Sequence, residues 1–297
     1  MQLKKLKTEK PNRASSNLDT MSALEMASLM NREDATVPRA IKRVLPQIAK
    51  AIEIIAQRLG RGGRLFYVGT GTSGRIGALD AVEIPPTFGT GPGTIQFVIA
   101  GGARALARAT ESSEDSITLG RHDMAARKPG KKDVVVGIAA SGRTPYTIGA
   151  MEYANIKGAA TIAVVCNKGS AMAGMAQVAI EVDVGPEVLT GSTRLKAGTA
   201  EKLICNMLST GAMARLGYVY GNLMVNLRPK NKKLFERAVT IVESVAGVNR
   251  EVAARALKAA GMQVPIALVM LKANVGKAEA SRRLKRADGI VRKALKG

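Results

Sequence analysis

The segment Leu65-Phe-Tyr-Val-Gly-Thr-Gly-Thr-Ser-Gly-Arg75 joins a short apolar run to a loop of glycine, serine and threonine, and a helical pattern follows it. Similar apolar runs begin at Gln96, Asp133, Thr161 and Val178. Apolar strands that alternate with helices are typical of a parallel sheet buried between helices. The sequence therefore predicts an α/β fold with helices on both faces of the sheet. Ligands in such folds bind outside the carboxyl ends of the strands, at a switch point in strand order.

Helical patterns flank this predicted sheet on both sides. Residues 37–59 carry apolar side chains at helical spacing, and Pro46 should kink or interrupt their helix. A hydroxyl in the segment Thr20–Glu25 is placed to start an earlier helix. After the sheet, residues 199–216 form a predicted long helix.

The C-terminal part of the chain has a different composition. Residues 236–297 are rich in alanine and lysine, and glycines at positions 247, 261 and 276 interrupt the helical pattern. This composition predicts a small helical bundle that follows the sheet. The expected parts are an N-terminal arm and helix over residues 1–45, a sheet domain over residues 46–230 and a helical bundle over residues 231–297.

The composition is that of a globular protein without a membrane segment. The chain has 297 residues, of which 46% are hydrophobic, and it contains no Trp. No apolar run is long enough to span a bilayer, and the basic N-terminus lacks the apolar stretch of a signal peptide. We therefore expect a cytoplasmic protein. Cys166 and Cys205 are expected to be buried small hydrophobes, because their spacing supports neither a disulfide framework nor a metal site.

The chain is strongly basic, with a formal net charge of +22. Such a charge could indicate a nucleic-acid-binding protein. The lysines and arginines are scattered, however, and no aromatic residues are interleaved with them for base stacking. We therefore expect no specific nucleic-acid binding, and we interpret the charge as a general field that gathers anionic substrates.

The loop after the first apolar run carries a phosphate-binding composition. Its spacing Gly69-x-Gly71-x-x-Gly74 also matches a dinucleotide-binding loop, but that match alone is weak. No acidic residue ends the next strand to hold a ribose, since Ala100-Gly-Gly follows it. The residues between the glycines are hydroxyl donors suited to a phosphate at a helix N-terminus. These donors are Thr70, Thr72 and Ser73.

The loop Ala140-Ser-Gly-Arg-Thr-Pro-Tyr146 repeats this chemistry after another strand. Ser141, Arg143 and Thr144 are its candidate ligand contacts, and Gly142 gives access to the backbone. Helix capping by serine and threonine is the alternative, but capping and phosphate binding use the same geometry. The two roles are therefore compatible, and the paired loops favour a phosphosugar.

A third polar segment, Gly185–Lys202, is dense in small donors and charges. Its glycines allow the backbone sharp turns and close approaches. Such a segment is poorly suited to fill a core and well suited to surround a small anionic ligand. Its candidate binding residues are Glu187, Ser192, Thr193 and Lys196.

The segment Gly185–Lys202 resembles, position for position, the signature of the family that unites N-acetylmuramic acid 6-phosphate etherases with the glucokinase regulatory protein. The resemblance extends over nearly the whole chain, from Leu18–Glu25 through Asn31–Pro38 to Arg292–Leu295. It implies a sugar isomerase (SIS) domain over residues 46–230, followed by a compact three-helix module. It also implies a phosphosugar substrate, a homodimer, and a reaction that needs neither metal nor organic cofactor.

The same resemblance places catalytic carboxylates at Glu83 and Glu114. Either could otherwise be a solvated surface charge. Pro85 and Pro86 are expected to end the helix after Glu83 and to hold it on a stiff loop, and Glu114 is expected on a helix. The resemblance assigns Glu83 to departure of lactate and addition of water. It assigns Glu114 to removal of the carbon-bound proton.

Two alternative functions within the fold remain on sequence grounds. A phosphosugar sensor like the glucokinase regulatory protein would need roughly twice this chain. A phosphosugar isomerase would also use a carboxylate base, but the context Glu83-Ile-Pro-Pro-Thr87 favours an etherase. His122 lies near Glu114, yet the family does not require a histidine there, so a surface or packing role is favoured.

Overall fold

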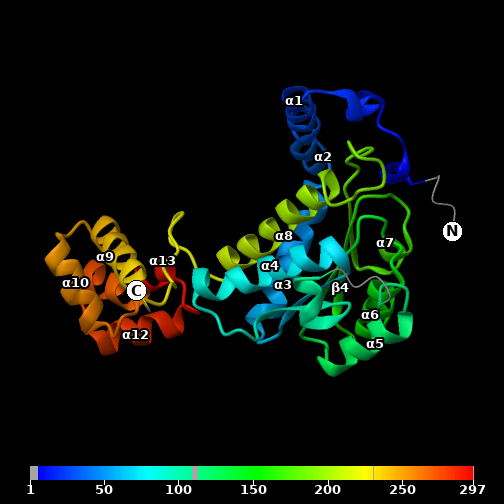
Figure 1. The fold of residues 1–297 in the computed structure, drawn as a ribbon. Helices are drawn as coiled ribbons and strands as arrows, with labels where there is room; N and C mark the ends of the chain where they lie inside the picture. The colour runs from blue at the N-terminus through cyan, green and yellow to red at the C-terminus, as the bar shows by residue number, and fades with distance from the viewer. Residues whose placement is uncertain (1–5, 109–112, 230, 297) are drawn as a thin grey trace. The chain divides into compact units, whose positions relative to one another are not determined.

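The computed structural model describes residues 6–108, 113–229 and 231–296, and it divides the chain into two compact units (Figure 1). Unit 1 comprises Met1–Val82 and Gly93–Ser209, whereas unit 2 comprises Glu83–Pro92 and Thr210–Gly297. The short segment Glu83–Pro92 therefore groups with the C-terminal helices. Our sequence-based domain boundaries stay a prediction.

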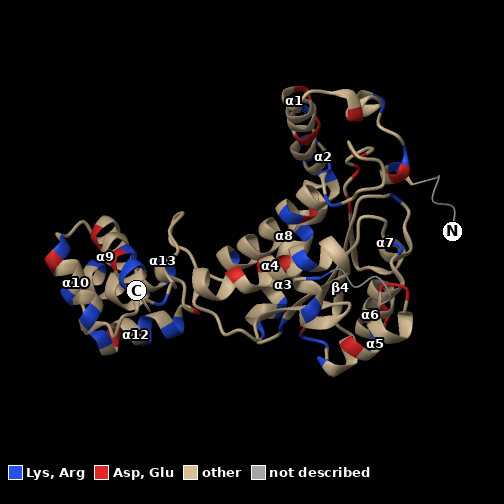
Figure 2. Cartoon of the chain, viewed as in Figure 1, with Lys and Arg blue, Asp and Glu red and all other residues tan. Residues whose placement is uncertain are grey.

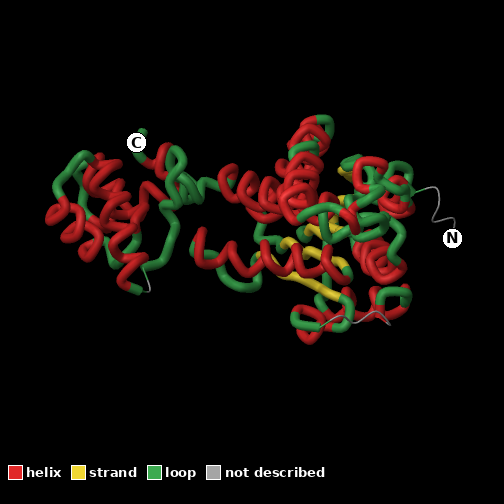
Figure 3. The backbone as a smooth tube through the Cα atoms, turned by 45° about the horizontal axis from the view of Figure 1, so that its top comes forward, coloured by secondary structure: helices red, strands yellow, loops and turns green. Residues whose placement is uncertain are grey.

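The centre of unit 1 is a five-stranded parallel sheet in the order β2-β1-β3-β4-β5. The strands are β1 Leu65–Gly69, β2 Ile95–Ile99, β3 Val134–Ile138, β4 Ala160–Val165 and β5 Val178–Glu181. This sheet confirms the predicted α/β fold, and Figure 3 shows its strands lying between helices. Because β1 lies between β2 and β3, the strand order reverses at β1, and the carboxyl ends of β1 and β3 form the switch point.

Alternate side chains of β1 pack on opposite faces of the sheet, as the pleat requires. Phe66 and Val68 are buried in a core formed with helices α5 (Ile117–Ala126) and α6 (Pro145–Ile156). On the other face, the hydroxyl of Tyr67 donates to Asp80 of α4 (Gly71–Phe88) at 2.8 Å. The same hydroxyl lies 3.3 Å from the backbone carbonyl of Cys205 in α8 (Lys196–Arg215). Both faces of the sheet are therefore covered, which explains why its strands read as continuous apolar runs.

Among the described residues, three α-helices precede the sheet: α1 (Ala23–Asp34), α2 (Val37–Lys42) and α3 (Leu45–Gly60). Ser22 caps α1 and forms a reciprocal capping box with Glu25, as the sequence indicates. The predicted helix over residues 37–59 is interrupted before Pro46, which lies in the first turn of α3.

The N-terminal arm packs against unit 1 from residue 6 onward. Leu6 and Thr8 are buried, and the backbone N–H of Lys7 donates to the side-chain oxygen of Asn167 at 2.9 Å. The side-chain amide of Asn12 donates to Glu33 of α1 at the same distance. The described part of this polar segment is therefore tied to the sheet domain by side-chain hydrogen bonds.

Helix α4 (Gly71–Phe88) continues through both prolines, so our prediction that they stop the helix after Glu83 is wrong. The physical reason is local compensation near the end of the helix. The hydroxyl of Thr87 donates to the carbonyl of Glu83 at 2.7 Å, and the N–H of Gly89 donates to the carbonyl of Pro85 at 2.9 Å. These bonds satisfy the last turn, and the helix ends only at Gly89, where φ is +67°.

The C-terminal helices of unit 2 share one apolar core, which confirms the predicted helical bundle. The resemblance implied three helices, but the described residues form five, because Gly247, Gly261, Gly276 and Gly289 each lie between two successive helices. Gly247 takes a left-handed conformation at the end of α9, and Gly276 precedes α12. The helices are α9 Lys232–Ala246, α10 Arg250–Ala259, α11 Val264–Ala273, α12 Lys277–Arg286 and α13 Val291–Ala294.

Lysine and arginine are distributed over elements of both units, with carboxylates among them (Figure 2). Within the described part of the chain, no single helix is long and apolar enough to cross a membrane. The pair α10 and α11 passes that test together by length and composition, but the two helices are bent by 115°.

Candidate functional site

The first hydroxyl loop of unit 1 lies at the switch point, between β1 and the first turn of α4. Thr70 is buried, whereas Thr72 and Ser73 are half-buried. The helix starts at Gly71, where φ is +49°, and the carbonyl of Thr70 accepts from the N–H of Gly74 at 2.9 Å. The free N–H groups of the first turn and the positive end of the helix dipole make this loop suited to a phosphate.

Glu114 lies against this first loop. A Cβ built on Gly71 would be 3.3 Å from Oε1 of Glu114, so a glycine leaves room for the carboxylate. The backbone carbonyl of Glu114 accepts from the N–H of Tyr146 at 3.0 Å, which ties it to the start of α6. Glu114 therefore lies where the first loop meets the beginning of the helix that follows the second loop.

The expected helix through Glu114 is not formed, and this prediction is wrong for the described residues. Glu111 and Ser112 of that segment lie outside the described residues, and Glu114 is in a turn. Helix α5 begins at Ile117 instead, because the hydroxyl of Ser116 accepts from the N–H of Leu119 at 3.1 Å and caps it.

The second hydroxyl loop follows β3, the strand paired with β1. The hydroxyl of Ser141 accepts from the N–H of Arg143 at 3.2 Å, and the Arg143 side chain is exposed. Gly142 has φ of +65°, and a side chain there would collide with the hydroxyl of Ser170. Thr144 precedes α6 but makes no capping hydrogen bond through its side chain, so capping does not account for its hydroxyl.

The third segment, Gly185–Lys202, leads into α8 (Lys196–Arg215), which begins three residues before the predicted start. The reason is Glu187. Its two carboxylate oxygens accept from the N–H groups of Lys196 and Ala197, both at 2.9 Å, so it caps the helix. Glu187 is fully buried, and this burial raises its pKa.

Lys196 is likewise engaged inside the fold. Its ammonium lies 2.8 Å from Oε2 of Glu33 in α1, and only 2% of the residue is exposed. Two of the charged residues expected to bind substrate thus have internal partners. Ser192 and Thr193 lie half-buried in the turn before α8, where the carbonyl of Thr193 accepts from the N–H of Gly198 at 3.0 Å.

The beginning of α8 also contacts the first hydroxyl loop. A Cβ built on Gly198 would lie 3.5 Å from the Thr72 methyl group. One turn further, the hydroxyl of Ser73 donates to Oε1 of Glu201 at 2.9 Å. Unit 1 therefore brings together the first loop, Glu114 and the start of α8.

Glu201 is the functional candidate that our sequence reasoning missed. It is 1% exposed, and its second oxygen, Oε2, has no hydrogen-bond partner. Burial raises its pKa to about 8, the charge of Glu187 adds to this effect, and the bond from Ser73 opposes it. The one signal in the sequence was its place, because Glu201 lies within the polar segment Gly185–Lys202 that we singled out.

Glu83 belongs to unit 2, where it lies on α4 with an exposed side chain. His122 lies exposed at the surface, with its Nδ1 3.3 Å from Oδ1 of Asp123. Cys166 and Cys205 are buried free thiols, as expected, and burial raises the pKa of each well above its ordinary value. Among the described residues, no group of three His, Cys, Asp or Glu side chains could hold a metal ion.

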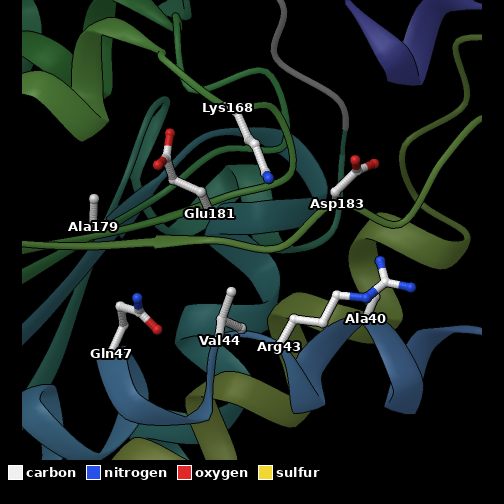
Figure 4. A pocket seen from close by; sticks show the side chains of 8 residues that line it. All are labelled: Ala40, Arg43, Val44, Gln47, Lys168, Ala179, Glu181 and Asp183. Carbon is white, nitrogen blue, oxygen red and sulfur yellow. The ribbon is translucent and has the colours of Figure 1, made fainter.

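A separate cavity of about 260 Å³ lies beside the edge strand β5. Lys168, Glu181 and Asp183 face Arg43 and Gln47 across it (Figure 4). None of the hydroxyl loops lines this cavity, so we do not assign it to the phosphosugar site.

A parallel sheet with two hydroxyl loops at its switch point defines a sugar-phosphate-binding domain of the SIS class. Family models agree, since residues 110–210 match the SIS domain and residues 47–155 match the glucokinase regulatory protein N-terminal SIS domain. Residues 221–261 match the C-terminal lid domain of glucokinase regulatory protein.

Full-length relatives give the particular family. The chain is 55% identical to the N-acetylmuramic acid 6-phosphate etherase of Burkholderia lata, over 99% of this chain and 97% of the relative. It is 52% identical to the etherase of Serratia proteamaculans, over 99% of both chains. The chain belongs to the N-acetylmuramic acid 6-phosphate etherase family.

Solved structures show the same fold at lower identity. A phosphoheptose isomerase from Francisella tularensis matches with a TM-score of 0.51 and 20% identity, over 65% of this chain and 98% of that chain. Phosphoheptose isomerase from Neisseria gonorrhoeae matches with a TM-score of 0.50 and 20% identity, over 65% of this chain and 100% of that chain. These likenesses concern the fold alone.

Proposed function

We propose that this protein cleaves the D-lactyl ether of N-acetylmuramic acid 6-phosphate and gives N-acetylglucosamine 6-phosphate and D-lactate. Family membership over nearly the full chain supports the reaction. The structural observation that carries the proposal is the position of Glu114, whose carboxylate lies against the first hydroxyl loop while its backbone is held by the start of α6. A base is thus placed beside a loop suited to a sugar phosphate.

In this proposal the phosphate lies at the N-terminus of α4. Thr70, Thr72 and Ser73 supply hydroxyl groups, and the first turn supplies N–H groups and the positive end of its dipole. The second loop adds Ser141, Arg143 and Thr144, and the turn before α8 adds Ser192 and Thr193. We assign Glu187 and Lys196 to shaping this wall, because both have internal partners.

The chemistry requires four proton transfers, two in the elimination of lactate and two in the addition of water. In the open-chain sugar, Glu114 removes the weakly acidic proton beside the aldehyde, and an acid protonates the ether oxygen as lactate leaves. Water then adds to the unsaturated intermediate: Glu114 returns its proton to the carbon beside the aldehyde, and the residue that protonated the ether oxygen accepts a proton from water. We assign this second role to Glu83 on the family resemblance. Each transfer contributes on the order of 10²–10⁴-fold to the rate.

The decisive experiment measures D-lactate release from N-acetylmuramic acid 6-phosphate, with the unphosphorylated sugar assayed in parallel. We expect release from the phosphorylated sugar only. Glu114→Gln should lower kcat by on the order of 10²–10⁴-fold with a small effect on KM, because its contribution arises in the transition state. The exposed Glu251→Gln, on α10, is the matched control and should retain activity. Phosphosugar binding without lactate release would instead indicate a phosphosugar sensor.

We also propose that the protein is a cytoplasmic homodimer that binds no nucleic acid specifically. The dimer rests on the family resemblance, and the scattered distribution of basic residues argues against a nucleic-acid-binding surface. Light scattering tests the dimer, and a mass of about one chain would contradict it. Competition between an unrelated DNA duplex and the phosphosugar, at two salt concentrations, tests the absence of specific nucleic-acid binding.

A further inference from the structure

Glu201 is a buried acid in direct contact with the proposed phosphate loop. Its Oε1 accepts from the hydroxyl of Ser73 at 2.9 Å, and its Oε2 has no partner. Among the described residues, no ion pair involves Glu201. Lys196 of the polar segment is paired with Glu33 instead. Among the described residues this carboxyl group neither caps a helix nor holds a cation, so its hydrogen bond to Ser73 determines what it can do.

The protonation state of Glu201 determines which way the Ser73 hydroxyl points. An ionised carboxylate only accepts, so Ser73 must donate its single hydrogen inward and presents lone pairs to the ligand. A protonated carboxyl group can donate to Ser73, which frees the serine hydrogen for a phosphate oxygen. A proton on Oε1 can be donated to the Ser73 hydroxyl, whereas a proton on Oε2 would have no acceptor. Protonation therefore converts Ser73 from an inward donor to an outward donor.

We propose that Glu201 is a positioning residue that orients the Ser73 hydroxyl, so that the chain binds a phosphosugar tightly only while Glu201 carries a proton. This inference rests on the proposed function, in which Ser73 contacts the phosphate. It deepens that function by assigning control of the phosphate contact to a residue that does not touch the substrate.

The groups around Glu201 favour its neutral form near pH 7. Burial and the charge of Glu187 raise its pKa to about 8, and the bond from Ser73 opposes them. The thiols of Cys166 and Cys205 interact with the same carboxyl group, and burial keeps both neutral by raising the pKa of each. A bound phosphate dianion would disfavour a second negative charge here, so binding should further favour the proton.

The test is binding of N-acetylglucosamine 6-phosphate, measured by calorimetry between pH 7 and pH 9.5. The second pKa of a phosphate monoester is about 6, so the ligand charge stays constant over this range. If only the protonated form binds, a pKa of about 8 predicts that affinity falls about 30-fold from pH 7 to pH 9.5. Glu201→Gln should keep the pH 7 affinity and lose this pH dependence, because its amide always donates to Ser73. Glu251→Gln should behave like the unaltered chain.

One further variant separates orientation from charge alone. Ser73→Ala should bind more weakly at pH 7 and show no pH dependence, whereas a dependence that persists in Ser73→Ala would overturn the route through the serine. A flat profile in the unaltered chain, with phosphosugar binding and lactate release intact, would overturn the inference and leave the proposed function standing. No phosphosugar binding at pH 7 would overturn both.

Discussion

Replacing Glu201 by glutamine should change how the stability of the folded chain depends on pH. The pKa of Glu201 is about 8 in the fold, against an ordinary value of 4.5. The folded state therefore holds a proton that the unfolded state releases between these two values. For a raised pKa, the stabilising contribution is fully present below pH 4.5 and is lost as the pH rises through 8.

The magnitude follows from the difference of 3.5 units between 8 and 4.5. At about 1.4 kcal/mol per unit, the full loss is roughly 5 kcal/mol. When the pH rises from 5.5 to 8.5, the same linkage lowers the free energy of unfolding by about 3 kcal/mol relative to a chain in which residue 201 does not titrate. Glutamine has nearly the same shape and does not titrate, so Glu201→Gln should lack that loss.

Urea unfolding at pH 5.5, 7 and 8.5 measures the effect as a difference between the unaltered chain and Glu201→Gln. The slope m should be the same for both, which would show that the variant changes stability and not compactness. Glu251→Gln controls for removing a carboxylate from an exposed helix. If the free-energy difference between the unaltered chain and Glu201→Gln stays constant across this pH range, Glu201 does not hold its proton on folding and the reasoning is refuted.

Three further predictions concern other parts of unit 1. Gly71→Ala should lower the free energy of unfolding by about 1–2 kcal/mol and should also reduce kcat. The reason is that φ is +49° at this position and the new methyl group would press on Oε1 of Glu114. Thermal unfolding measures the loss of stability, and lactate release measures kcat. Lys196→Met and Glu33→Gln should each lower the free energy of unfolding by about 3 kcal/mol, because each leaves the charge of the other residue without its ion-pair partner. The double variant should cost less than their sum, which a double-mutant cycle in urea tests. Cys166 and Cys205 should resist a thiol reagent in the folded chain and react in urea, because burial raises the pKa of both thiols.

The sheet and the loops could be predicted from the sequence because their signals are local. Each strand is a continuous apolar run, since both faces of a parallel sheet are buried, and glycine and hydroxyl residues mark the point where a strand ends. The interruption near Pro46 was predictable for the same reason. Local signals also indicated the C-terminal bundle, although the number of its helices had to be read from the glycines and not from the resemblance.

The errors arose where a distant or later residue determines the local structure. Proline usually ends a helix, but hydrogen bonds from Thr87 and Gly89, which follow the prolines, hold the last turn of α4. The earlier start of α8 depends on Glu187, nine residues before Lys196, whose carboxylate caps the helix from outside it. Glu201 resembles any surface acid in the sequence, and only the contact with Ser73 across 128 residues distinguishes it.

The internal use of charge in the polar segment has a consequence for how an anion can be bound. Glu187 caps the first N–H groups of α8, and Lys196 forms an ion pair with Glu33. Neither residue therefore contributes a free charge to the wall of the proposed site. In the proposed site, hydroxyl and backbone N–H donors, with the dipole of α4 and the side chain of Arg143, then provide the contacts to the phosphate. Neutral donors cost less to bury than cations, but each is effective only when its hydrogen points at the ligand. A site built this way depends on the orientation of hydroxyl groups, and a buried acid that reverses one of them can therefore alter affinity without adding or removing a contact.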